Sequence, residues 1–123
     1  MNIADRVTLA REVARVLRRR GRFSCVETAQ GPAGPPVFPL PWAIDPSSSY
    51  LATPEAMRAA VEQAGLQIVE QINFTAEVAK RGDPPHQAND VVMGDDFELR
   101  RANVMSGLRE QRLVDQLIVA KKP

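Results

Sequence analysis

The sequence predicts an α/β protein, in which helices alternate with the strands of one sheet. Three observations lead to this prediction. Apolar residues near the amino terminus recur at steps of three and four, which is the spacing of an amphipathic helix. Short apolar runs follow at 22–28, 67–74 and 113–120 and have the length and composition of strands. A second helix, with a clear start and stop, separates the first two of these runs.

The 123 residues correspond to one domain or to part of one, and their composition is that of an ordinary globular protein. Hydrophobic residues make up 44% and charged residues 25%, which is typical neither of disordered chains nor of membrane proteins. The sequence contains no run of about 18 apolar residues, so it predicts no membrane span. The single cysteine, Cys25, excludes an internal disulfide and suits a reducing compartment. We therefore expect a cytoplasmic protein.

Charge is unevenly distributed along the chain, although the net charge is only +1. Residues 1–24 hold seven arginines and two acidic residues and so carry +5, which leaves −4 for the remainder. Four of these arginines recur by fours and threes and would form one basic stripe on a helix: Arg11, Arg15, Arg18 and Arg22. Such a stripe can contact nucleic acid or an acidic partner. Because no aromatic residues interleave it, we interpret it as a solvated face and expect no nucleic-acid partner.

The first helix is expected to begin at Asp5, whose side chain can accept a backbone N–H as an N-cap. Its apolar stripe includes Leu9, Val13 and Val16. Three arginines gather at its carboxyl end, where the helix dipole favours cations, and Gly21 is the expected left-handed stop.

A long loop follows the first strand. Six prolines lie within residues 32–46, and they exclude regular structure and predict an extended, semi-rigid loop over residues 31–50. The loop also carries aromatic and aliphatic side chains, so we expect it to pack against the rest of the fold. The second helix then has Thr53 as N-cap, Pro54 at its first position and Gly65 at its end.

A strand, a loop and a third helix are expected to follow the second helix. Leu66, Ile68, Ile72 and Phe74 are predicted to alternate on one face of a strand, and Glu70 interrupts this pattern as a sheet-edge strand would. Residues 75–95 are expected to form a loop with at most one helical turn. Asp95 or Asp96 then caps a third helix.

The last strand, residues 113–120, is almost continuously apolar, so we expect other elements to cover both of its faces. We accordingly place it between the other two strands and antiparallel to both.

Several stretches resemble class I S-adenosylmethionine-dependent methyltransferases. Residues 12–27, EVARVLRRRGRFSCVE, resemble the family's helix-turn-strand unit, whose turn is commonly L-R-P-G-G; here Arg19 and Arg20 replace the usual Pro and Gly. The segments TPE at 53–55, GL at 65–66 and LIVAKKP at 117–123 resemble the family's next helix and strand and its terminal antiparallel strand. The proline-rich stretch at 30–42 resembles the subgroup that includes sarcosine and dimethylglycine methyltransferases.

This resemblance implies that residues 1–123 are a single partial domain. They would form the C-terminal half of a Rossmann-like methyltransferase sheet, with three strands, the last of them antiparallel, and with helices packed on it. The family binds S-adenosylmethionine on its first half, through a glycine-rich turn and an acidic residue that holds the ribose. The seven glycines here give no G-x-G-x-G, so we expect no binding of the cofactor by this chain alone. A truncated gene, a misplaced start codon and one part of a split protein all remain open.

Candidate site residues follow from where ligands bind in this fold. Ligands of open α/β sheets sit beyond the carboxyl ends of the strands, where Glu27 and Gln30 lie. Trp42 and Tyr50 lie in the proline-rich loop, and their ring faces can hold a cationic amine as methyl acceptor. The opening Met1-Asn2-Ile3 resembles the segment after the family's fourth strand, so Asn2 would line the donor pocket if the other half were present.

Simpler interpretations of these residues stay open. Trp42 would equally serve as a packing anchor for the loop, Glu27 as a solvated strand end, and Asn2 as part of a frayed terminus. His86 has no second histidine or cysteine at metal-ligand spacing, so no metal site is expected.

Two functions are therefore weighed. The first is the acceptor-side half of a methyltransferase for a small metabolite, inactive without its cofactor-binding half. The second is a non-catalytic interaction module, which forms a homodimer or pairs with a complementary methyltransferase half. In both, the 22–28 strand would expose an unpaired edge, which is a template for another strand. The first helix would then leave Leu9, Val13 and Val16 in water.

Overall fold

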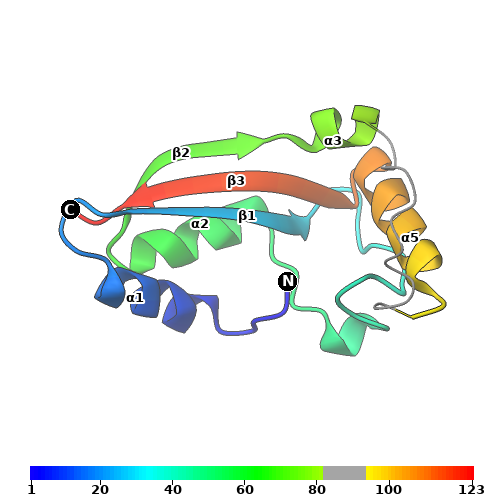
Figure 1. Ribbon diagram of the computed structural model, residues 1–123, viewed down its shortest axis with the longest axis horizontal. Coiled ribbons are helices and arrows are strands. Elements are labelled where there is room, and N and C mark those ends of the chain that lie inside the picture. Colours follow the sequence, from blue (N-terminus) through cyan, green and yellow to red (C-terminus); the bar gives the residue numbers. More distant parts are fainter. Residues whose placement is uncertain (82–93) are drawn as a thin grey trace.

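The computed structural model describes residues 1–81 and 94–123. Its elements are, in order, α1 (Arg6–Val16), β1 (Arg22–Gln30), the 3-10 turn η1 (Pro46–Ser48), α2 (Pro54–Gln63), β2 (Gln67–Asn73), α3 (Thr75–Arg81), α5 (Phe97–Arg109) and β3 (Leu113–Lys121). The strands form one sheet, α1 and α2 lie together on one side of it, and α3 and α5 lie near the end where β3 begins (Figure 1). The α/β prediction is confirmed.

β3 is the central strand, and the order in the sheet is β1-β3-β2. It runs antiparallel to both neighbours, as predicted from its apolar sequence. Leu113 and Ala120 are fully buried and Ile118 is 1% exposed, so the strand supplies much of the core.

The two faces of the sheet differ in their cover. On one face Cys25 lies opposite Ile118, and Ile118 packs against Met57 of α2. On the other face Val26, Leu117 and Ile72 form a row across the three strands. Val26 is 68% exposed and Ile72 is 39% exposed. The expectation of cover on both faces of β3 is therefore wrong for the described part of the chain.

α1 begins as predicted, because the side chain of Asp5 accepts a hydrogen bond from the Thr8 backbone N–H at 2.9 Å. Val13 packs against the helical side of the core, but Leu9 and Val16 are 45% and 68% exposed. The predicted left-handed stop at Gly21 is wrong, since the positive φ, 63°, falls on Arg20.

Gly21 has a different role. A Cβ there would lie 2.8 Å from the Arg18 carbonyl oxygen, so the turn needs a residue without a side chain.

α2 has the predicted ends. The Thr53 hydroxyl accepts from the Ala56 N–H at 3.2 Å, Pro54 opens the helix, and Gly65 follows it with φ +80°. In β2, however, the pairing register shifts between Ile68 and Glu70. This bulge puts Ile68 on the helical face and leaves Ile72 on the open face, so the predicted alternation on a single face is wrong.

A helix also stands where a loop was expected. α3 covers seven residues, more than the single turn predicted at the start of the 75–95 segment. The Asn73 side-chain oxygen accepts from both the N–H and the hydroxyl of Thr75, which starts this helix. Residues 82–93 of the expected loop lie outside the described residues. Asp96 precedes α5, but its carboxylate binds Arg100 at 2.8 Å and does not cap the helix.

The proline-rich loop packs against the rest of the fold, as predicted, and the structure shows that it contacts α5. Leu40 is fully buried in a cluster with Met105, Leu108 and Leu113. Two side chains of α5 also donate to loop carbonyls, because the Asn103 amide binds the Pro39 oxygen at 2.9 Å and the Arg100 guanidinium binds that of Leu40 at 3.3 Å.

Gly31 provides a test of how closely this loop approaches the start of β3. Its N–H donates to the Arg112 oxygen at 2.9 Å, and a Cβ would lie only 2.1 Å from the Gln111 carbonyl oxygen. The Gly31→Ala variant should lose about 2–4 kcal/mol of unfolding free energy, because backbone has to move. The neighbouring Pro32→Ala change, at an exposed position, should cost less than about 1 kcal/mol. Urea unfolding followed by circular dichroism measures both, and equal midpoints would contradict this packing.

Candidate functional site at the carboxyl end of β1

Three segments meet where β1 ends. The Gln30 N–H donates to the Ala52 oxygen at 2.8 Å, which holds the end of the proline-rich loop beside the strand. The Tyr50 N–H donates to the Met1 oxygen at 2.9 Å, so the amino-terminal segment also runs here. The structure therefore brings the first residues of the chain, the strand end and the loop end into one place.

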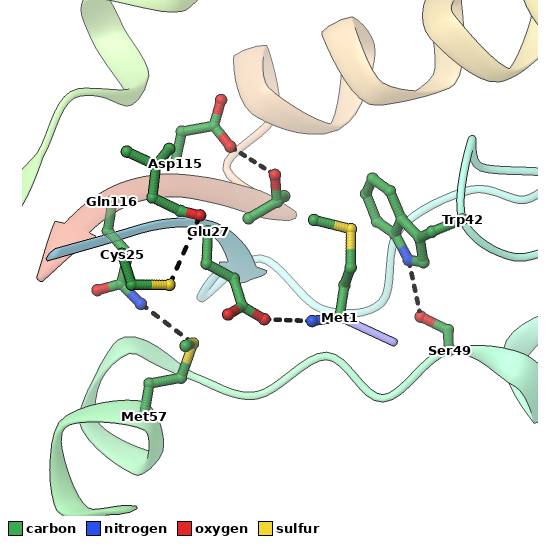
Figure 2. Close-up of polar contacts among 10 residues, drawn as sticks. Met1, Cys25, Glu27, Trp42, Ser49, Met57, Asp115 and Gln116 are labelled. Carbon is green, nitrogen blue, oxygen red and sulfur yellow. Dashed lines mark hydrogen bonds and ion pairs between the residues drawn. The ribbon is translucent and has the colours of Figure 1, made fainter. Parts of the chain in front are cut away.

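Glu27 is the polar centre of this region. Its side chain is 20% exposed and forms an ion pair with the Met1 amino group (Figure 2). A carboxylate that is partly withdrawn from water interacts strongly with a cation, because screening is weaker there. The Glu27 carboxylate is thus placed to hold a positively charged group.

The other predicted residues have different surroundings. Trp42 is half-buried against the cluster around Leu40, and its ring N–H donates to the Ser49 hydroxyl at 3.2 Å (Figure 2). Tyr50 is 43% exposed, and Asn2 is exposed at the amino terminus. The Glu27 side chain and the Tyr50 backbone therefore contact Met1, whose neighbour in the chain is Asn2, and Gln30 contacts Ala52. The Trp42 ring contributes instead to the packing of the loop.

A small cavity of about 50 Å³ lies between α1, α2 and β1. Glu27 and Arg6 are its only charged lining residues, and the rest are mainly apolar, including Leu9, Phe23, Cys25 and Met57. Pockets that hold small molecules usually measure about 300–1,000 Å³, so this one does not take an acceptor as it stands. Burial raises the pKa of the Cys25 thiol, and the Glu27 charge adds to the effect, so this thiol is not an activated nucleophile.

Arg6 was not among the residues predicted from sequence. Its Nε and Nη2 atoms are buried and have no hydrogen-bond acceptor among the described residues. An unpaired buried donor costs about 1–3 kcal/mol or more when charged. No local pattern marks Arg6, since an arginine in a first helical turn is ordinarily solvated.

A second polar group lies on the open face of the sheet. The Thr28 hydroxyl donates to the Asp115 carboxylate at 2.7 Å, across the β1–β3 pair. Burial raises the pKa of Asp115, and the Thr28 hydrogen bond opposes that rise. The sequence carried a signal for it, because Asp115 interrupts an otherwise apolar strand.

A larger, open hollow of about 770 Å³ lies between α3, α5 and the start of β3. Its lining includes Asn73, Lys80, Arg109 and Leu113, and none of the predicted acceptor residues belongs to it. Within residues 1–81 and 94–123 no group of three potential metal ligands occurs, and His86 lies outside them. No described helix is both long and apolar enough to cross a membrane.

The fold can be compared with solved structures. No family model matches the sequence, and no characterised protein matches it at the sequence level. Geranyl diphosphate C-methyltransferase from Streptomyces coelicolor A3(2), solved with Mg²⁺, geranyl diphosphate and S-adenosyl-L-homocysteine, superposes with a TM-score of 0.69 and 15% identity, over 97% of this chain and 43% of its own. The chain therefore has the fold of one part of a class I methyltransferase.

Other methyltransferases of this fold give the same result. Phosphoethanolamine N-methyltransferase 2 from Haemonchus contortus has a TM-score of 0.67 and 14% identity, over 99% of this chain and 31% of its own. A putative sarcosine dimethylglycine methyltransferase from Galdieria sulphuraria has a TM-score of 0.65 and 15% identity, over 99% of this chain and 49% of its own. The present chain thus spans less than half the length of these methyltransferases.

Trp42 and Tyr50 are both aromatic residues of the same loop, but their burial differs. The Trp42→Ala variant should lose roughly 2–3 kcal/mol of unfolding free energy, because a half-buried indole leaves the cluster around Leu40. Tyr50→Ala is the matched control and should change this free energy by less than about 0.5 kcal/mol, since the ring is largely in water. Thermal or urea unfolding measures both values. If the two variants were equally stable, Trp42 would not be a packing anchor.

Proposed function

We propose that this chain is the acceptor-side half of an S-adenosylmethionine-dependent methyltransferase that acts on a small metabolite. In this proposal it has no activity without a cofactor-binding half. The observation that carries it is the superposition: nearly the whole chain matches methyltransferases, yet it matches less than half of each.

The lack of a glycine-rich motif for binding the methyl donor also supports the proposal. Methyl donors of this kind are already activated, so a methyltransferase mainly positions the two reactants and excludes water. Holding the donor requires bare backbone near its amino-acid part and a carboxylate on its ribose, as in dinucleotide folds. The sequence contains no G-x-G-x-G that would form such a cradle.

The acceptor would then bind beyond the carboxyl end of β1. Glu27 would hold a cationic amine in the place where it now pairs with the Met1 amino group. Tyr50, exposed at the end of the loop, would supply an aromatic face for the same cation. Gln30 would contribute polar contacts, Trp42 would keep the loop in position, and Asn2 would line the donor side once the cofactor-binding half is present.

Calorimetry with S-adenosylmethionine tests this function. The isolated chain should show no heat of binding up to millimolar cofactor, because the donor cradle is absent. Full-length geranyl diphosphate C-methyltransferase from Streptomyces coelicolor, titrated in the same buffer, is the positive control. Micromolar binding by the isolated, monomeric chain would refute the proposal that it lacks the cofactor half.

A second candidate function is a non-catalytic interaction module, and the open edge of β1 favours it. Within residues 1–81 and 94–123, β1 pairs only with β3, so one row of its backbone groups faces away from the described sheet. Exposed strand edges recruit other strands. The chain should therefore self-associate, and sedimentation velocity across micromolar to millimolar concentration should show a mass that rises with concentration. A folded chain that stays strictly monomeric over this range would exclude the second function.

A further inference from the structure

Five basic residues gather at one end of the sheet. The turn after α1, the start of β1 and the end of β3 meet there, at the opposite end of the molecule from α5 (Figure 1). Arg22 and Lys121 are direct partners in the β1–β3 ladder, and the turn between α1 and β1 adds Arg18, Arg19 and Arg20. We call these five residues the basic cluster.

The backbone that carries the basic cluster is fixed by hydrogen bonds. The Gly21 N–H donates to the Arg18 oxygen at 2.9 Å and closes the turn. The Arg20 N–H donates to the Lys122 oxygen, and the Lys122 N–H donates to the Gly21 oxygen, both at 2.9 Å. The turn is thus joined to the chain just after β3. A surface whose backbone is already ordered loses less conformational freedom when it binds a partner.

The helix dipole does not account for these arginines. Basic side chains near the last turn of a helix ordinarily interact with its free carbonyl groups. In this chain Lys122 has that role, because its ammonium group donates to the Ala14 oxygen at 2.6 Å and to the Leu17 oxygen at 2.9 Å. The carboxyl end of α1 is therefore stabilised without the basic cluster.

No ion pair within residues 1–81 and 94–123 neutralises the basic cluster. Arg15, in the last turn of α1, does bind Glu12 at 2.8 Å. Glu70 lies opposite Val119 in the β2–β3 ladder, but among the described residues it forms no ion pair with Lys121. The four arginines of the cluster are all exposed. Their guanidinium groups are therefore free to bind an anion.

Two features of the basic cluster reduce the stability of the fold. Arg20 has a φ of 63°, in the left-handed region that glycine adopts more easily than any residue with a Cβ. Arg22 and Lys121 stand directly opposite one another, and like charges in a cross-strand pair destabilise a sheet. Unfavourable local arrangements of this kind occur mainly at sites that bind ligands or partners.

We propose that the basic cluster binds an acidic segment of a partner protein, in which several Asp or Glu residues lie close together. Arginine binds carboxylates through two parallel hydrogen bonds, which are among the strongest that side chains form. This inference is independent of methyl transfer, because the cluster lies at the amino end of β1 and the candidate functional site lies at its carboxyl end.

The size and composition of the basic cluster favour a short acidic segment over a nucleic acid. Proteins that bind single strands stack the bases on aromatic side chains. Phe23 follows Arg22 in the chain, but it lines the small cavity between α1, α2 and β1. Binding to a duplex commonly involves about 6–10 phosphates along an extended face. The cluster instead holds its five cations around one turn and two strand ends.

Fluorescence anisotropy of a labelled hexaglutamate peptide tests this proposal. The peptide should bind at about 20 mM salt and should bind more weakly at about 150 mM, where charges are screened over about 8 Å. Arg19→Gln and Arg22→Gln should each weaken binding by about twofold to fivefold, as for an exposed ion pair. The matched control is Arg109→Gln, which removes the same charge from an exposed position in α5 and should leave binding unchanged.

Arg20→Gly separates binding from folding. Glycine relieves the left-handed conformation, so the urea midpoint should rise. Loss of the guanidinium group should weaken binding of the peptide by about twofold to fivefold. A lower midpoint or unchanged binding would show that Arg20 serves the fold alone and would contradict the proposal.

The remaining outcomes distinguish the acidic segment from other anions. Equal weakening by Arg109→Gln and the cluster variants would indicate a response to net charge and would overturn the proposal. Tighter binding of a labelled DNA duplex, or of vesicles that contain anionic lipid, would overturn it in favour of another partner. Lack of peptide binding at low salt would also overturn it. The substituted residues are exposed, and circular dichroism verifies that each variant is folded.

Discussion

The pairing of β3 with strands on both sides is the interaction on which the rest of this structure depends. β3 is the last element of the chain, and it joins β1 to β2 although neither of them pairs with the other. Its residues then hold the remaining layers, since Ile118 packs against α2 and Leu113 packs against α5 and the proline-rich loop. The loop and both flanking strands are therefore all held by contacts with β3.

The placement of the helices explains why one face of this sheet is exposed. α1 and α2 both lie on one side, so alternate residues of β3 are buried and those between them remain partly in water. An α/β sheet normally buries both faces, and a chain of this size buries only about two-thirds of its unfolded surface. Among the described residues, no helix covers the row at Val26, Leu117 and Ile72, and no strand pairs with the outer edge of β1. A complementary half or a second copy would use the same edge, so the two modes of association exclude each other.

The candidate site is shaped by the same incompleteness. Glu27 holds a cation at the carboxyl end of β1, where ligands of such sheets bind. Nearby, Arg6 has buried nitrogens without an acceptor among the described residues. Charged groups in partial burial are favourable only with partners. An acceptor for Arg6 would therefore stabilise this end of the fold.

The sequence by itself determined the features that depend on neighbouring residues. The N-caps at Asp5 and Thr53, the proline at the start of α2 and the glycine at its end follow from local backbone chemistry, and all were predictable. The central position of β3 was predictable as well, because its sequence is almost continuously apolar, whereas an edge strand usually carries exposed polar residues. Glu27 and Gln30 could be placed at a strand end for the same local reason.

Only the tertiary structure decided what lies against each of these elements. The bulge in β2, the helix at 75–81 and the left-handed Arg20 became evident only in the structure. The packing role of Trp42 depends on a cluster that includes Met105, Leu108 and Leu113, which lie far along the chain. The hydrogen bond of Thr28 to Asp115 likewise joins residues that are distant in sequence. The open face of β3 could not be predicted from its sequence. An apolar strand indicates that both of its faces favour burial, but it does not indicate which other residues cover them.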